Sequence, residues 1–165
     1  MTISQTTWKR ATAFALVLAI GFVPGAAHAK GVIKGTFGTE KFKAKKLLVA
    51  CGYLRSLGFF SIAGAQGNAK KQKAASLSGL GPDPTAPGTA FPIVLTETQA
   101  SYTSGPSGPT APTWIAATDG VVVTLTGFKK GKVFGTVTGT LAGGYFGAVG
   151  PIEVNATFNG KCLVQ

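Results

Sequence analysis

Histidine, methionine, cysteine and acidic residues are all scarce in this sequence. Its 165 residues include 1 His, 1 Met and 2 Cys, and only 5 Asp and Glu against 16 Lys and Arg. The single histidine, His28, lies in an N-terminal stretch with the pattern of a cleaved signal. The chain beyond it therefore lacks the residues of a Ser-His-Asp triad, a histidine-activated thiol or a histidine-ligated metal. This composition predicts a protein that is not an enzyme and has no cofactor or metal.

The few acidic residues do not indicate a catalytic pair either. A glycosidase-like mechanism needs two carboxylates held at a defined separation. No spacing in the sequence brings two of the acids together, and two of them stand in turn-forming contexts, Asp83 between prolines and Asp119 before Gly120. We therefore predict that the acids are solvated surface residues: Glu40, Asp83, Glu97, Asp119 and Glu153.

The N-terminus has the three parts of an export signal. Lys9-Arg10 is followed by an uncharged run from Ala11 to Val23 and then by Ala27-His28-Ala29, an A-x-A cleavage pattern. The apolar run is shorter than the roughly 20 residues that a membrane-spanning helix needs. We expect residues 1–29 to be a signal peptide and the mature chain to begin at Lys30, with no transmembrane segment. The expected location is bacterial, either periplasmic or extracellular.

The remainder, residues 30–165, shows the alternation of strands and no helical apolar spacing over three turns. Three turns, at Gly38-Thr39, Asp119-Gly120 and Lys129-Lys130-Gly131, are each expected to join the strands on either side into a hairpin. We predict strands at Val32–Phe37, Glu40–Lys46, Leu47–Leu54, Phe59–Ala63, Phe91–Tyr102, Trp114–Thr118, Val121–Phe128, Lys132–Leu141, Ile152–Phe158 and Lys161–Val164.

Loops are expected where glycine and proline gather. Gly79–Gly88 and Ser104–Thr113 each contain three prolines, and Gly64–Ala75 has no clear alternation. Neither side of these loops could bury a core alone, so they do not separate domains. The sequence thus predicts a single all-β domain over 30–165, either an antiparallel β-sandwich or a partly open β-barrel.

The two cysteines, Cys51 and Cys162, are expected to form a structural disulfide. Export would place them in an oxidising compartment, where an even number of cysteines pairs. A redox or nucleophilic thiol would instead need a nearby base or a C-x-x-C pair, and the sequence has neither.

Positive charge is concentrated in the first part of the mature chain. Between Lys30 and Lys73 there are ten basic residues and one acid, Glu40. A strand places alternate residues on one face, so three lysines between Glu40 and Lys46 should share a face opposite Phe42 and Ala44. A second lysine group follows in the expected loop. The candidate anion-binding residues are Lys41, Lys43, Lys45, Lys70, Lys71 and Lys73.

This lysine-rich segment has two interpretations. If both groups converge, they form a cationic patch for a polyanion such as an acidic glycan, a lipid head group or a nucleic acid. Alternatively, lysines on an edge strand prevent edge-to-edge aggregation. The absence of interleaved aromatic residues does not favour base stacking.

Threonines form a further pattern, alternating with apolar residues on both sides of the Lys129-Lys130-Gly131 turn. They are Thr124, Thr126, Thr136, Thr138 and Thr140. Such an array could bind ice or sugars, but threonine is also simply a common residue on the solvent face of a strand.

The order of strands resembles a group of uncharacterised bacterial secreted and lipoprotein β-domains. The resemblance rests on the segments Val32–Gly38, Lys41–Ala44, Ser61–Gly64, Gly120–Thr126, Val133–Leu141 and Val154–Gly160. It implies an antiparallel β-fold and no known activity, and the lipidated N-terminal cysteine of many of those proteins is absent here. The function expected from the sequence is a secreted, non-catalytic binding or structural module. The alternative is a self-assembling or adhesin-like subunit of the cell envelope, and the sequence indicates no specific protein partner.

Overall fold

A computed structural model describes residues 31–46, 49–68, 70–106, 110–116 and 120–165. The predicted signal peptide and Asp119 lie outside these ranges. Apart from one 3₁₀ turn, η1 (Arg55–Leu57), the regular structure of the described chain is β. Its strands are β1 (Gly31–Phe37), β2 (Glu40–Lys46), β3 (Val49–Leu54), β4 (Phe59–Asn68), β5 (Lys71–Leu80), β6 (Ile93–Val94), β7 (Thr96–Gly105), β8 (Thr113–Ile115), β9 (Val121–Lys129), β10 (Lys132–Tyr145), β11 (Ile152–Gly160) and β12 (Leu163–Val164).

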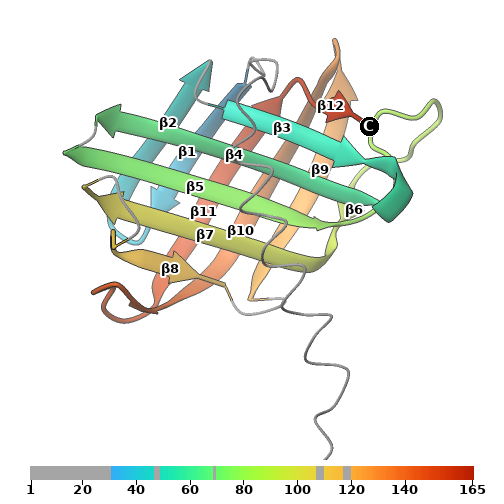
Figure 1. Cartoon of the computed structure of the whole chain (residues 1–165). Helices are drawn as coiled ribbons and strands as arrows, with labels where there is room; N and C mark the ends of the chain where they lie inside the picture. Colours follow the sequence, from blue (N-terminus) through green and yellow to red (C-terminus); the bar gives the residue numbers. More distant parts are fainter. Residues whose placement is uncertain (1–30, 47–48, 69, 107–109, 117–119) are drawn as a thin grey trace, which may run out of the picture.

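These strands form one large, mostly antiparallel sheet of 12 strands that does not close, which confirms the all-β prediction. The sheet order is β12-β3-β4-β5-β7-β8-β10-β11-β1-β2, with β9 beside β10 and β6 beside β9. β12 runs parallel to β3. In Figure 1, β3, β4, β5, β7 and β8 cross in front of β1, β2, β9, β10 and β11, which run steeply behind them.

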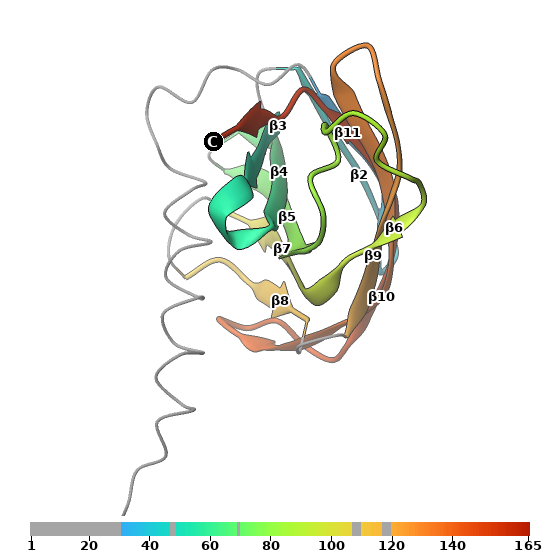
Figure 2. The same cartoon turned by 90° about the vertical axis from the view of Figure 1, so that its right-hand side faces the viewer.

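The core lies between these two halves of the sheet, which Figure 2 shows as facing layers. Each strand contributes alternate side chains to it, as the pleat requires. An aromatic cluster fills one end: the Tyr102 ring stacks on Phe37 with centroids 4.5 Å apart and meets Phe42 at 6.1 Å and Trp114 at 5.9 Å. This cluster packs residues of β1 and β2 against β7 and β8, and so joins the two halves.

The predicted loop at Gly64–Ala75 is wrong, because the structure continues β4 to Asn68 and begins β5 at Lys71. Alanine, glycine and lysine have low strand propensity, but pairing on both sides decides the conformation here. Ala75 pairs with Gly64 on β4 and with Tyr102 on β7. The turn itself is short, and the Asn68 Oδ1 accepts the main-chain N–H groups of Lys70 and Lys71 at 3.1 Å each.

The predicted hairpin across Asp119-Gly120 is also wrong. β8 pairs with β7 on one edge and β10 on the other, while β9 pairs with β10 and β6. Both edges of β8 and both edges of β9 are therefore paired with other strands, and β8 and β9 do not form a hairpin with each other. Likewise, Phe91–Tyr102 is not a single strand: β6 pairs in one half and β7 in the other, and Figure 2 shows the segment after β5 passing between the halves.

The hairpin predicted at Lys129-Lys130-Gly131 is confirmed. Lys129 pairs with Lys132, and the two residues between them, Lys130 and Gly131, have φ values of 53° and 71°. Positive φ at both central positions is the type I′ geometry, whose twist matches that of the flanking strands.

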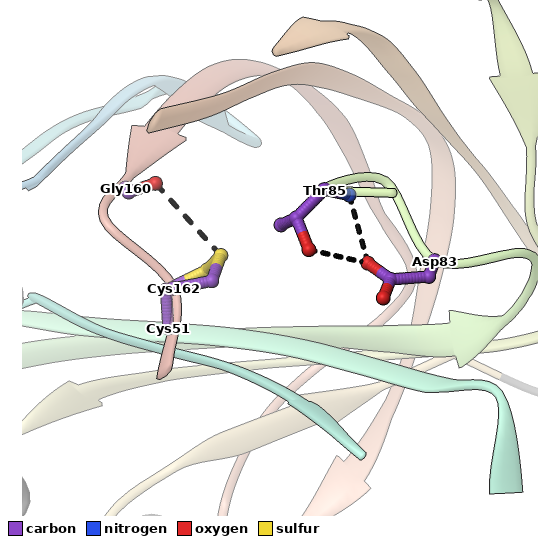
Figure 3. Close-up of a disulfide and its surroundings, with 5 residues drawn as sticks. All are labelled: Cys51, Asp83, Thr85, Gly160 and Cys162. Carbon is purple, nitrogen blue, oxygen red and sulfur yellow. Dashed lines mark hydrogen bonds between the residues drawn. A yellow bond between two sulfur atoms is a disulfide. The ribbon is translucent and has the colours of Figure 1, made fainter. Parts of the chain in front are cut away.

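The C-terminus is fixed by the disulfide between Cys51 on β3 and Cys162, just before β12 (Figure 3). Beyond it, the Gln165 N–H donates to the Tyr53 carbonyl at 3.0 Å. The loop after β5 lies nearby, where Asp83 accepts from the N–H and hydroxyl of Thr85 and pairs with Arg55 at 2.8 Å. The predicted disulfide is thus present in the structure and holds the two-residue terminal strand against β3.

Candidate anion-binding site

β2 presents its lysines on one exposed face, as the alternation predicts. Lys41, Lys43 and Lys45 are exposed, while Phe42 and Ala44 between them are buried in the core. β2 lies at one end of the sheet order, so these lysines stand at the margin of an outer sheet face.

A fourth lysine, Lys34 on β1, belongs to this group and was not among the candidates from the sequence. It pairs directly with Lys43 in the β1–β2 register and is exposed. The positive charge of Lys45, and to a smaller extent that of Lys34, lowers the pKa of Lys43. The predicted hairpin around Gly38-Thr39 already contained the signal, because its register sets Lys34 opposite Lys43.

The second lysine group approaches β2 through the β4–β5 hairpin, whose tip lies beside β2 in Figure 1. The Oε1 atom of Gln66 on β4 accepts the main-chain N–H of Lys43 at 2.5 Å. On β5, the Nζ atom of Lys73 lies 3.0 Å from the Glu40 carboxylate. The two sequence segments therefore meet at the free edge of β2.

Glu40 is the centre of this junction. Its Oε2 atom accepts hydrogen bonds from the Tyr102 hydroxyl and, at 3.0 Å, from the Ser104 hydroxyl, in addition to the Lys73 ion pair. The Tyr102 hydrogen bond, helped by Lys73 and Ser104, outweighs desolvation and lowers the pKa of Glu40. Burial, and then the adjacent Glu40 carboxylate, raise the pKa of the Tyr102 phenol. Lys73 therefore neutralises Glu40 and contributes to the junction between the halves.

Lys70 and Lys71 stand at the exposed tip of the hairpin. Lys71 is two residues from Lys73 on β5, so both side chains leave the same face of the strand. That face of β5 also carries the buried Ala75 and Leu77, whereas Lys41, Lys43 and Lys45 project from the outer face of β2. The lysines that the structure places together are therefore Lys34, Lys41, Lys43 and Lys45, and Lys73 is paired with Glu40.

Of the other acids of the described chain, Asp83 and Glu97 belong to the other half of the sheet, and Glu153 lies on the outer face of β11 beside the β1–β2 turn. Asp83 binds Arg55 in the loop after β5, Glu97 is exposed at the start of β7, and Glu153 accepts the Thr140 hydroxyl at 2.9 Å. Within the described ranges no three His, Cys, Asp or Glu side chains gather as a metal site. The local field at the edge of β2 is therefore positive.

A shallow apolar hollow occurs elsewhere, at the turn between β10 and β11. It is lined by Ala142, Gly143, Ala148, Val149, Gly150 and Pro151. Binding sites for small molecules combine an apolar wall with a few polar groups that orient the ligand. No charged side chain lines this hollow, and we do not assign a ligand to it.

Among the described residues, no helix has the length and apolar character needed to cross a bilayer. Comparison of the chain with known protein families, curated proteins and solved structures found no match.

Proposed function

We propose that this protein is an exported, non-catalytic module that binds a polyanion at the exposed lysines of β1 and β2. The observation that carries the proposal is the pairing of Lys34 with Lys43 on an exposed face, flanked by Lys41 and Lys45. Like charges placed directly opposite each other on a sheet are destabilising. A bound anion would relieve that repulsion. The arrangement is therefore better explained by ligand binding than by a contribution to the stability of the fold.

The other interpretation, edge protection, accounts for less of this arrangement. The N–H of Lys43 at the edge of β2 is already occupied by Gln66. Edge protection also does not require Lys34, which lies on β1 between two partner strands, β2 and β11.

Two further expectations belong to this proposal. The disulfide supports export, since such bonds persist in oxidising compartments. We class the fold as a partly open β-barrel, because β2 at one end of the sheet contacts Gln66 on β4 near the other end.

The test is polyanion binding by the triple variant K41Q/K43Q/K45Q, measured with inorganic polyphosphate over a range of salt concentrations. Screening acts over about 10 Å at 0.1 M salt, so a surface site made of lysines should weaken steeply as salt increases. We expect the variant to bind less tightly and to show a flatter salt dependence, with a melting temperature close to that of the wild type because exposed charges contribute little to stability.

The matched control is K129Q/K130Q/K132Q at the β9–β10 turn, which removes the same charge on strands away from β2. It should retain most of the binding. Equal losses in the two variants would mean that only net charge matters and would contradict the proposed site. Wild-type binding by K41Q/K43Q/K45Q, together with new aggregates in light scattering, would establish edge protection instead.

A further inference from the structure

The lysines of β1 and β2 continue into rows of hydroxyl and amide side chains that cross the sheet. Residues paired in an antiparallel register project from the same face. Following the printed registers from β2 through β1 and β11 to β10 gives two rows on the outer face. The first is Lys43, Lys34, Thr157, Thr136 and, on β9, Thr124; the second is Lys41, Thr36, Asn155 and Thr138.

These rows are open to solvent. Thr36, Asn155, Thr157 and Thr138 are exposed, and Thr136 is partly exposed. The Thr157 hydroxyl donates to the Lys34 carbonyl at 3.3 Å, so its oxygen remains free to accept. The two rows therefore carry cations at one end, on β1 and β2, and groups that both donate and accept hydrogen bonds on β11 and β10.

A third row adds an aromatic side chain. Lys45 pairs with Val32, Val32 with Asn159, and Asn159 with Phe134, whose side chain is 37 % exposed. On this face of the described chain the one acid is Glu153, which lies at the end next to the β1–β2 turn and holds the Thr140 hydroxyl.

We propose that the polyanion is an acidic polysaccharide, and that its chain lies across β2, β1, β11 and β10. This inference rests on the proposed function and names its ligand class. Lysines at Lys34, Lys41 and Lys43 would pair with carboxylate or sulfate groups, while the threonines and Asn155 exchange hydrogen bonds with sugar hydroxyls. Strands lie ~4.8 Å apart, so the four strands from β2 to β10 span about 14 Å, which suits a short run of sugars in an extended chain.

The same face is poorly suited to the other polyanions. Single-stranded nucleic acid binding depends on aromatic side chains interleaved with cations, and the two lysine rows contain none. A bilayer surface would require exposed apolar side chains beside the lysines. The exposed apolar side chains of this face, Val122 and Phe134, lie on β9 and β10, which β1 and β11 separate from the lysines of β2. The exposed Tyr145, Phe146 and Val149 lie at the turn between β10 and β11.

The experiment removes hydroxyls and leaves the lysines in place. In T136V/T157V, valine keeps the branched shape of threonine and its preference for strands, so the fold should be retained. The ligands are polygalacturonate, which carries carboxylates, dextran sulfate, which carries sulfates, and inorganic polyphosphate, which has no sugar hydroxyls. We expect T136V/T157V to bind both polysaccharides about tenfold more weakly than the wild type, because two hydrogen bonds are lost. Polyphosphate binding should remain within twofold of the wild type.

Two controls complete the design. T96V/T103V removes two hydroxyls from β7, in the other half of the sheet, and should leave all affinities unchanged. K34Q/K43Q should weaken the binding of every polyanion. Melting temperatures of all variants establish that the fold is intact.

The outcomes separate the two proposals. If T136V/T157V binds both polysaccharides as the wild type does while K34Q/K43Q fails to bind polyphosphate, the polysaccharide inference is wrong and the polyanion site stands. If K34Q/K43Q binds every ligand normally, both are wrong. Tighter wild-type binding to single-stranded DNA or to anionic phosphatidylserine vesicles than to either polysaccharide would overturn the assignment of the ligand class.

Discussion

Loss of the disulfide should remove a large part of the stability of this fold. Cys51 and Cys162 are 111 residues apart, so their bond closes most of the described chain into one loop. In the chain-entropy model, closing a loop of that length lowers the conformational entropy of the unfolded chain, and this stabilises the folded state by about 4.8 kcal/mol. Small domains are stable by roughly 5–15 kcal/mol in total, so the bond accounts for a third or more of the free energy of unfolding.

The native contacts around the bond should survive its removal. β12 keeps its two register pairs with β3, and the Gln165 carbonyl still accepts the Arg55 N–H at 2.8 Å. The effect should therefore appear mainly in the unfolded state. We expect C51A/C162A to fold at 25 °C but to unfold at lower urea, with a larger m-value, because its unfolded chain exposes more surface than the cross-linked one.

Equilibrium urea unfolding, followed by tryptophan fluorescence, measures both quantities. Reduced wild-type protein is the matched control, since it lacks the bond but keeps both sulfur atoms, and its difference from C51A/C162A gives the packing contribution of the nearly buried Cys51. A loss below about 1 kcal/mol with an unchanged m-value would refute the chain-entropy reasoning. It would mean that the unfolded chain is already as compact without the bond as with it.

Two further predictions concern the core and the Glu40 junction. G135A should destabilise the protein by about 1–3 kcal/mol, because a Cβ at Gly135 would lie 2.3 Å from Phe158 Cζ; G127A, where nothing lies within 4 Å, should change the urea midpoint little. The raised pKa of Tyr102 means that its contribution to stability is fully present below pH 10.0, the ordinary pKa of the phenol, and is lost as pH rises above it. The wild-type melting temperature should therefore fall above pH 10.0, and Y102F should reduce that fall. The control Y145F, which changes a half-exposed tyrosine, should keep the wild-type fall. An equally steep fall in Y102F and Y145F would contradict the role of the buried Tyr102 phenol.

Local alternation was sufficient to predict the parts of the fold that a single hairpin determines. β1, β2 and the β9–β10 turn follow from a period of two and from turn residues with positive φ. β5 could not be predicted in this way, because Ala74 and Ala75 have no strong preference for a strand. Their conformation is set by β4 and β7, and such pairing is a tertiary effect.

The candidate site likewise has a part that local sequence patterns predict and a part that depends on tertiary pairing. The exposed face of Lys41, Lys43 and Lys45 follows from the sequence, and the β1–β2 register gives Lys34. The rows that continue through Thr157 to Thr136 depend on β11 lying between β1 and β10, a pairing of segments more than a hundred residues apart. The Glu40 junction likewise depends on how the two halves pack, which no local pattern contains.

The placement of β11 between β1 and β10 also constrains the order of folding. During synthesis the β1–β2 hairpin is made well before β11, the strand that completes its sheet, because more than a hundred residues separate β2 from β11. A lone two-stranded hairpin is marginally stable in water at best. The lysine-bearing strands therefore acquire their final geometry only after β11 is available, and contacts of such long sequence separation favour slow folding. A chain that lacks β11 would present these lysines on an isolated hairpin, and the ordered face exists only once β11 has paired with both β1 and β10.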